Sequence, residues 1–240
     1  MPPSDQKQEN SSKSIMDAQK LKAESAERFY QMGFTIVPFI SNSKKSECSK
    51  WSEKNREALY DETISYLLNN NGNYGLRTDH VVCVDVDAKE KNESKATPIL
   101  FNEKNYDMYQ FADKMREYAT LQQSSISGNP HVFFQRDERM KHWTKKTEIH
   151  GFVDILTTNK AMVMGANSTI DNKQYSLHKD LDIQRMPDDL FEWIDLYMGT
   201  TEKHSKPKNT LIQNVLTTED IEIATKLYSL LNVERVNSYG

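Results

Sequence analysis

Residues 80–87 read His-Val-Val-Cys-Val-Asp-Val-Asp, and this stretch is the strongest strand signal in the chain. It follows a turn-rich segment, Asn-Asn-Asn-Gly-Asn-Tyr-Gly, at residues 69–75. A short apolar run bounded by turn residues predicts a buried strand. Because side chains alternate along a strand, the carboxylates of Asp85 and Asp87 are expected on the same face.

The two carboxylates at the end of this strand indicate a metal site. Ionised together they repel each other, unless divalent cations bind between them. Mg²⁺ and Mn²⁺ are hard cations that prefer such oxygen ligands. An Asp-x-Asp pair also occurs at solvated strand ends, so the pair by itself leaves both interpretations open.

Helix and strand patterns alternate on both sides of this stretch. A helix is expected from a weak capping box at Ser14 to Gly33, and residues 34–40 predict a strand in which Pro38 indicates an edge position or a bend. Further elements are expected from their apolar periodicity: helices over 63–68, over 106–115 and from Met186 onward, and strands at 131–135, 151–156 and 161–165. This mixture predicts an α+β fold.

Composition bounds the class of protein. The 240 residues carry a net charge of −4, so nucleic-acid binding would have to be confined to a local surface. No apolar run approaches the roughly 20 residues that span a bilayer, and residues 1–14 lack the apolar core of a secretory signal. We therefore expect an intracellular protein that is neither secreted nor in a membrane. Two cysteines in different contexts argue against a disulfide scaffold and a thiolate zinc site.

Two further motifs carry chemistry. Residues 127–131, Ser-Gly-Asn-Pro-His, form a turn that places a hydroxyl, backbone amides and an imidazole at the head of a strand, where phosphate oxygens can bind. A plain turn whose histidine caps the strand is the alternative.

Asp154 interrupts an apolar strand, and burying its charge is costly unless a partner or a metal meets it. Asp154 is thus a metal-ligand candidate or a structural residue. Lys160, Ser168 and Tyr175 follow it, and either contact a substrate or line a hairpin.

Lysines also gather near two tryptophans. Lys141, Lys145 and Lys146 surround Trp143, and Lys44 and Lys45 precede Trp51. Either group has the composition to contact phosphates and stack a base. A solvated loop with a packed tryptophan is the competing interpretation.

The order of these segments resembles the bifunctional primase-polymerase domain of the archaeo-eukaryotic primase superfamily, over roughly residues 23–198. The resemblance rests on AERFYQMGFTIVPF, NYGLRT, VVCVDVD, SGNPHVFF, FVDIL and MPDDLFEWI, which follow one another in that order. It implies an archaeo-eukaryotic primase fold, with a mixed sheet, a ferredoxin- or RRM-like catalytic half, an N-terminal α/β part and a C-terminal helical segment.

The resemblance also implies an activity and its residues. The expected function is a DNA primase/polymerase that transfers nucleotides from nucleoside triphosphates along a single-stranded DNA template. Asp85, Asp87 and Asp154 would be catalytic and would hold Mg²⁺ or Mn²⁺ in a two-metal mechanism. The implied nucleotide-binding residues are Ser127, Gly128, Asn129, His131 and Lys160.

The expected domain organisation follows from composition and from the resemblance. Residues 1–14 read as a disordered tail, 15–199 as the catalytic domain and 200–210 as a linker. Residues 211–240 resemble the start of a helical module that leads to a helicase, as in primase-helicases of large DNA viruses or mobile elements. The chain is then a truncated piece whose partner is the helicase region of the same polypeptide.

Two alternatives remain open at this point. The chain is either a catalytically silent primase-like module that binds DNA or assembles a replicative helicase, or an Asp-x-Asp glycosyltransferase that uses nucleotide sugars. The first would retain the fold without nucleotide incorporation. The second would need neither the Ser-to-His turn nor Asp154.

Overall fold

The computed structural model describes the backbone of residues 3–198 and the side chains of residues 16–198. The α+β class is confirmed, because helices and mainly antiparallel sheets make up this part of the chain. None of its helices is long and apolar enough to cross a membrane. The helices are α1 (Pro3–Gln31), α2 (Arg56–Asn69), α3 (Met108–Arg116) and α4 (Asp188–Met198), with short 3₁₀ turns at Glu90–Asn92 and Glu138–Met140.

A seven-stranded mixed sheet forms the centre of this unit. Its strand order is β13-β6-β7-β3-β9-β8, and β14 pairs with β7 as the one parallel neighbour in the sheet. The strands are β3 (Val81–Val86), β6 (Gln122–Ser124), β7 (Pro130–Gln135), β8 (Thr147–Ile149), β9 (Val153–Leu156), β13 (Ser176–Lys179) and β14 (Gln184–Arg185). The predicted strand at residues 80–87 is therefore the central strand β3.

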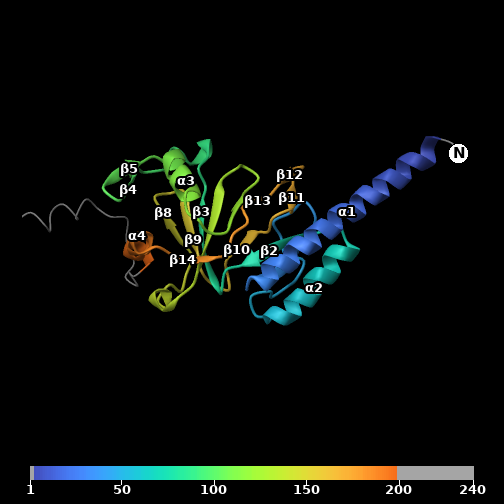
Figure 1. Cartoon of the computed structure of the whole chain (residues 1–240), viewed down its shortest axis with the longest axis horizontal. Coiled ribbons are helices and arrows are strands. Elements are labelled where there is room, and N and C mark those ends of the chain that lie inside the picture. The colour runs from blue at the N-terminus through green and yellow to red at the C-terminus, as the bar shows by residue number, and fades with distance from the viewer. Residues whose placement is uncertain (1–2, 199–240) are drawn as a thin grey trace, which may run out of the picture. The chain divides into compact units, whose positions relative to one another are not determined.

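Strand β3 is buried on both faces, which is why its sequence is an almost continuous apolar run. Val82, Val84 and Val86 face a core that α3 and α4 complete. Val81 and Cys83 face a second core that includes residues of α1 and of a smaller sheet. Figure 1 shows α3 and α4 on one side of β3 and β9, with α1, α2 and β2 on the other.

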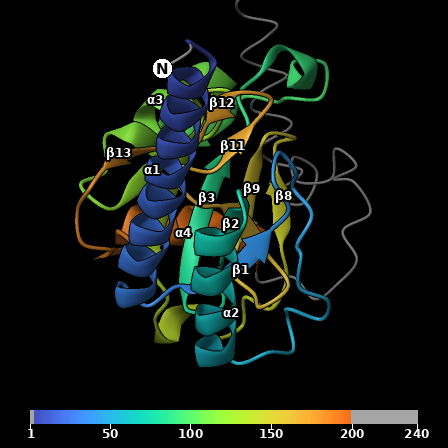
Figure 2. The same cartoon turned by 90° about the vertical axis from the view of Figure 1, so that its right-hand side faces the viewer.

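The smaller sheet has three strands in the order β1-β2-β10. These are β1 (Thr35–Phe39), β2 (Asn73–Arg77) and β10 (Met162–Met164). In the part of the chain that the structure describes, β2 is the one strand beside β1 in this sheet, so β1 is an edge strand, as one of the two interpretations of Pro38 predicts. Helices α1 and α2 run side by side over this sheet (Figure 2). Two short hairpins complete the strands: β4 (Ile99–Phe101) with β5 (Lys104–Tyr106), and β11 (Thr169–Ile170) with β12 (Lys173–Gln174).

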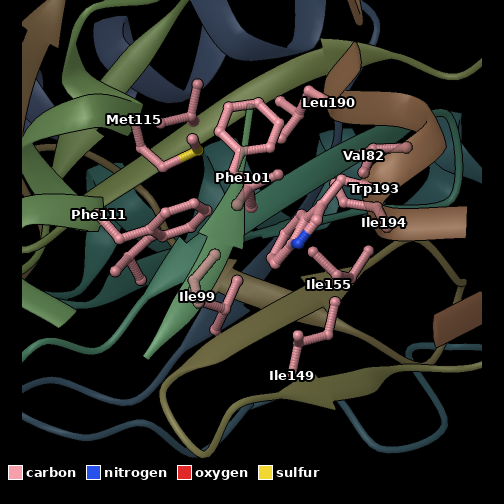
Figure 3. Close-up of a cluster of buried hydrophobic side chains, with 14 of the residues drawn as sticks. Val82, Ile99, Phe101, Phe111, Met115, Ile149, Ile155, Leu190, Trp193 and Ile194 are labelled. Atoms are coloured by element: carbon pink, nitrogen blue, oxygen red, sulfur yellow. The ribbon is translucent and has the colours of Figure 1, made fainter. Parts of the chain in front are cut away.

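Aromatic side chains fill the core beneath α3 and α4. Trp193 of α4 packs against Phe101 at 5.9 Å and Phe111 at 5.3 Å between ring centroids. Figure 3 shows these rings beside Ile99 and Ile155, so the core joins α4, α3, β4 and β9. The helix expected from Met186 onward is confirmed as α4, with Pro187 directly before its first turn.

Several boundaries differ from the sequence-based expectations. Helix α1 begins at Pro3, within the expected tail 1–14, where Gln6, Lys7, Gln8 and Glu9 are good helix formers but no apolar periodicity reveals a helix. Helix α2 begins at Arg56 with Asn55 as N-cap, ahead of the expected range 63–68. Tyr106 ends strand β5 instead of starting α3, because Asp107 caps that helix with a capping box. The expected linker 200–210 and helical module 211–240 lie outside the described residues.

Candidate active site

One row of polar side chains crosses the seven-stranded sheet. Asp85 of β3 pairs directly with His131 of β7 on one side and with Asp154 of β9 on the other. Gln123 and Glu148 extend the row, because they pair with His131 and Asp154 respectively. Residues paired directly across strands point to the same face. Two residues earlier along β3, the same face carries the apolar side chains of Cys83 and of its partners Phe133 and Leu156.

Asp87 lies just beyond the end of β3 on the same face. Its amide donates to the carbonyl of Phe152 at 2.7 Å, which continues the pairing toward β9. Asn92 Nδ2 donates to the Asp87 carbonyl oxygen at 2.7 Å and to Oδ2 at 3.1 Å, and Lys89 forms an ion pair with the carboxylate. The expectation that Asp85 and Asp87 share one face is therefore met by the strand geometry.

A chain of hydrogen bonds orients His131 toward Asp85. Gln123 Nε2 donates to the carbonyl of Met164 at 2.6 Å and lies 2.9 Å from His131 Nδ1. With the amide in this orientation, Nδ1 accepts and the ring proton sits on Nε2, which lies 3.3 Å from Asp85 Oδ1. Burial alone would raise the pKa of Asp85, but the proximity of His131 and its hydrogen bond, with Lys146 and Lys89 further away, lower the pKa below its ordinary value.

Asp154 is in the opposite electrostatic state. Burial raises its pKa, the neighbouring Asp85 and Glu148 carboxylates add to this rise, and Lys146 opposes it. Lys146 Nζ lies 2.5 Å from Oδ2, while Oδ1 is buried with no hydrogen-bond partner. A buried carboxylate oxygen without a partner is costly, so this atom is suited to accept a cation.

The donor set fits a hard divalent cation in kind. Asp85, Asp87 and Asp154 supply oxygen ligands on one face, and one oxygen of Asp154 is unpartnered. Among the side chains of residues 16–198, no group of three or more His, Cys, Asp or Glu residues is arranged so that it could hold a metal ion. Lys89 pairs with the Asp87 carboxylate and Lys146 with the Asp154 carboxylate, so each of these two charges has a cationic partner within the protein.

A cleft of about 400 Å³ opens beside this row. Its walls come from both sheets and from the loops that join them. Of the sequence-based candidates, Asp85, Asp87, Ser127 and His131 line it, together with Tyr175. The other lining residues are Phe39, Lys44, Lys89, Ser125, Ile126, Met162, Val163, Met164 and Lys173.

A family model described as the N-terminal domain of bifunctional DNA primase/polymerases (Prim-Pol) matches residues 26–189. The chain belongs to this family. No curated protein shows significant similarity to it. Membership of the Prim-Pol family identifies a primase/polymerase-type domain of DNA replication, a nucleotidyltransferase class whose substrates are DNA and nucleotides and which generally uses divalent metals.

The Ser-to-His turn of this Prim-Pol domain joins β6 to β7. Ser125 and Ser127 hydroxyls lie 3.0 Å apart, and Asn129 Nδ2 donates to Ser127 Oγ at 3.3 Å. Gly128 has a φ of 80°, a left-handed conformation that favours glycine. Ser127 thus reaches the cleft, while Gly128 and Asn129 shape the turn behind it. Ser125 was not singled out by sequence reasoning, and its position two residues before Ser127 is the signal that was available.

Other candidates of the Prim-Pol domain lie elsewhere. Lys160 is exposed in the turn between β9 and β10, at the end of β9 remote from Asp154, and is not among the cleft residues. Ser168 is buried and its hydroxyl is hydrogen-bonded to the backbone of Tyr74, which is a structural role.

Trp143 is fully buried and stacks on Phe191 at 5.4 Å, so the hypothesis that it stacks a base is wrong. Its indole is hydrophobic enough to be captured by the core once α4 packs over it.

Proposed function

We propose that this domain is a DNA primase/polymerase that transfers nucleotides from nucleoside triphosphates to a primer or first nucleotide on a single-stranded DNA template. One observation carries the proposal: Asp85 and Asp154 meet on adjacent strands, with Asp87 on the same face and His131 and Ser127 at the adjoining cleft. Family membership supports the class of reaction. The site would act inside the cell, where template and nucleotides are present.

We also propose that the architecture is the archaeo-eukaryotic primase fold. The antiparallel order β6-β7-β3-β9, with α3 connecting β3 to β6, supports a ferredoxin- or RRM-like catalytic half. Sheet β1-β2-β10 with α1 and α2 would be the N-terminal α/β part. The helicase region proposed as partner lies outside the described residues.

Asp85, Asp87 and Asp154 would hold the divalent cations. Bound Mg²⁺ or Mn²⁺ would supply the charge that activates the attacking 3′-hydroxyl and neutralises the triphosphate. The chain's own residues prepare for this chemistry: burial and like charge raise the pKa of Asp154, which a cation would reverse. Lys146 and Lys89 would release their carboxylates when a cation takes their place.

His131 and Ser127 would position the nucleotide. His131 is held from behind by Gln123, and its Nε2–H points toward Asp85 at the cleft, so it is arranged to donate a hydrogen bond and not to act as a general base. The Ser127 hydroxyl and the backbone amides of the neighbouring turn are suited to donate hydrogen bonds to phosphate oxygens. Tyr175 closes the cleft beside His131, with ring centroids 6.1 Å apart.

The test is primer synthesis and extension on single-stranded DNA with labelled ribo- or deoxynucleotides and Mg²⁺ or Mn²⁺. Wild type is expected to form products, and the Asp85→Ala/Asp87→Ala double variant is expected to lose at least about a thousandfold in rate, as when a member of a catalytic unit is removed. The chain offers a matched control: Asp180 and Asp182 form a second, exposed Asp-x-Asp pair outside the cleft.

The control variant Asp180→Ala/Asp182→Ala should polymerise like wild type, and circular dichroism should show all three proteins folded. A double variant at Asp85 and Asp87 with wild-type activity would overturn the proposal. Folded wild type that binds DNA but never incorporates nucleotides would favour the catalytically silent module. Hydrolysis of nucleotide sugars without polymerisation would favour the glycosyltransferase alternative.

A further inference from the structure

Two lysines reach the cleft from segments that the carboxylate row does not use. Lys44 belongs to the loop after β1, and Lys173 is the first residue of β12. Both segments are attached to the three-stranded sheet, whereas Asp85 and Asp87 come from the seven-stranded sheet. The cleft therefore receives its carboxylates from one sheet and these two cations from the other.

Lys173 is placed by a tight hairpin. Asp171 and Asn172, with φ of 51° and 58°, form the two-residue connection between β11 and β12, a conformation that Asp and Asn tolerate. The hairpin is anchored on β2 by a reciprocal pair of hydrogen bonds: Asn73 Nδ2 donates to the Thr169 carbonyl at 2.7 Å, and the Thr169 amide donates to Asn73 Oδ1 at 3.0 Å.

Lys44 is placed by a loop that folds back on β1. The Ile40 amide donates to the Lys45 carbonyl at 3.0 Å, and Ser46 bridges to Phe39. The loop is also tied to the hairpin, because Asn42 Oδ1 accepts from the Asp171 amide at 2.5 Å. Hydrogen bonds thus hold the two lysine-bearing segments to each other and to the sheet.

These two lysines have no ion-pair partner among the side chains of residues 16–198. The third cleft lysine, Lys89, is by contrast paired with Asp87. Two exposed ammonium groups held at one cleft without carboxylate partners repel each other weakly and favour a ligand with several negative charges. A polyphosphate is such a ligand, and it can bridge from these cations to cations bound at the aspartates.

We infer that Lys44 and Lys173 bind the terminal phosphates of the incoming nucleoside triphosphate and make the cleft selective for triphosphates over monophosphates. The inference rests on the proposed function for the identity of the nucleotide, and on the geometry alone for the binding of a polyphosphate. Lys44 and Lys173 then act as positioning residues for the leaving pyrophosphate, and Lys160 does not.

Direct binding provides the test. Isothermal titration calorimetry with sodium tripolyphosphate in Mg²⁺ buffer is compared between wild type, Lys44→Met/Lys173→Met and the control Lys45→Met/Lys50→Met. Lys45 and Lys50 are exposed lysines of the same loop region that do not line the cleft. The Lys44→Met/Lys173→Met variant should bind tripolyphosphate about tenfold or more weakly, since each substitution removes a charge-assisted contact. The control should bind like wild type.

A nucleotide titration on the same variants separates this inference from the proposed function. In the cleft double variant, the KM for the nucleoside triphosphate should rise about tenfold while kcat changes little. Unchanged tripolyphosphate affinity in that variant, or no binding by wild type, would overturn the inference even if polymerisation is observed. Absence of polymerisation by wild type would overturn only the proposed function, because the calorimetric comparison does not require catalysis.

Discussion

Asp85 and Asp154 face each other directly across two neighbouring strands. Like charges in this position destabilise a sheet. A different partner offsets the repulsion at each carboxylate: His131 lies against Asp85, and Lys146 lies against Asp154. The pKa of Asp85 is lowered and that of Asp154 is raised, so the two carboxylates are not equivalent in the protein without metal. This arrangement is costly for stability and is suited to binding cations.

Gln123 is the residue that holds His131 in place, and its loss should be measurable. In Gln123→Met, the His131 Nδ1 and the Met164 carbonyl lose a donor inside the protein. We expect the free energy of unfolding to fall by about 1–2 kcal/mol. The loss is moderated because the substitution also removes Gln123 Oε1, a buried acceptor that has no hydrogen-bond partner. Urea denaturation monitored by circular dichroism measures the change.

The matched control is Gln174→Met, since Gln174 is exposed in β12. Its unfolding midpoint should stay close to that of wild type. Equal stability of Gln123→Met and wild type would show that the hydrogen-bond chain does not contribute to the fold. In that case the orientation of His131 would need another explanation.

At the scale of elements, the turn between β8 and β9 sets the position of Asp154. His150 and Gly151 have φ of 53° and 78°, so the chain reverses through two left-handed residues. The turn lies only a few residues before Asp154, and its geometry sets the register between β8 and β9 that places Glu148 opposite Asp154. Gly151 has a second constraint, because a Cβ there would lie 2.6 Å from the carbonyl oxygen of Lys95.

Gly151→Ala should therefore destabilise the domain by about 2–5 kcal/mol, combining the left-handed penalty with the backbone clash. Gly128→Ala is the matched comparison, because Gly128 has a similar φ of 80° but a Cβ added there would meet no atom within 4 Å. That variant should lose only about 1–2 kcal/mol. Denaturant unfolding measures the loss of stability in both variants. Equal losses in the free energy of unfolding would refute the role of the Lys95 contact.

At the scale of the whole described unit, His150 links three segments of the fold. Its Nδ1 lies 2.6 Å from the Thr97 hydroxyl and its Nε2 lies 2.9 Å from the Tyr197 hydroxyl of α4. The ring also stacks on Trp193, with centroids 6.4 Å apart. Burial lowers the pKa of His150 below its ordinary value of 6.5. The half-buried imidazole therefore packs at the edge of the core that α4 closes, where burial disfavours its protonated form.

The lowered pKa of His150 in the folded protein predicts that stability depends on pH. Below pH 6.5 the unfolded chain binds a proton at this residue that the folded protein resists, so the free energy of unfolding falls as the pH drops from 6.5 toward the lowered pKa. Above pH 6.5 His150 contributes no such change. Melting temperatures between pH 8 and pH 5 should fall less steeply in His150→Asn, which tolerates the positive φ and does not titrate.

The comparison of slopes removes the effect of other groups that titrate at acid pH. His150→Asn is expected to lower stability at pH 8, because the hydrogen bonds to Thr97 and Tyr197 are changed. Only the difference in slope reports on protonation. Parallel slopes for the variant and wild type would contradict the prediction.

The sequence by itself determined the main elements and the order of the motifs. Strand β3, helix α4 and the edge strand with Pro38 were predictable because their signals are local: an apolar run, a proline-led amphipathic helix and a residue without a backbone donor. Alternation along one strand was enough to place Asp85 and Asp87 on one face. The motif order was enough to recognise the family that the family model identifies.

Only the tertiary structure decided which side chains meet. The pairing of Asp85 with Asp154 and His131 depends on strand register, which couples residues far apart in the chain. Burial of Trp143 depends on the packing of α4. Lys44 and Lys173 reach the cleft because the loop after β1 and the β11–β12 hairpin fold onto the smaller sheet and are hydrogen-bonded to each other. Such long-range contacts are set by the packing of distant parts of the chain, so no local pattern predicts them.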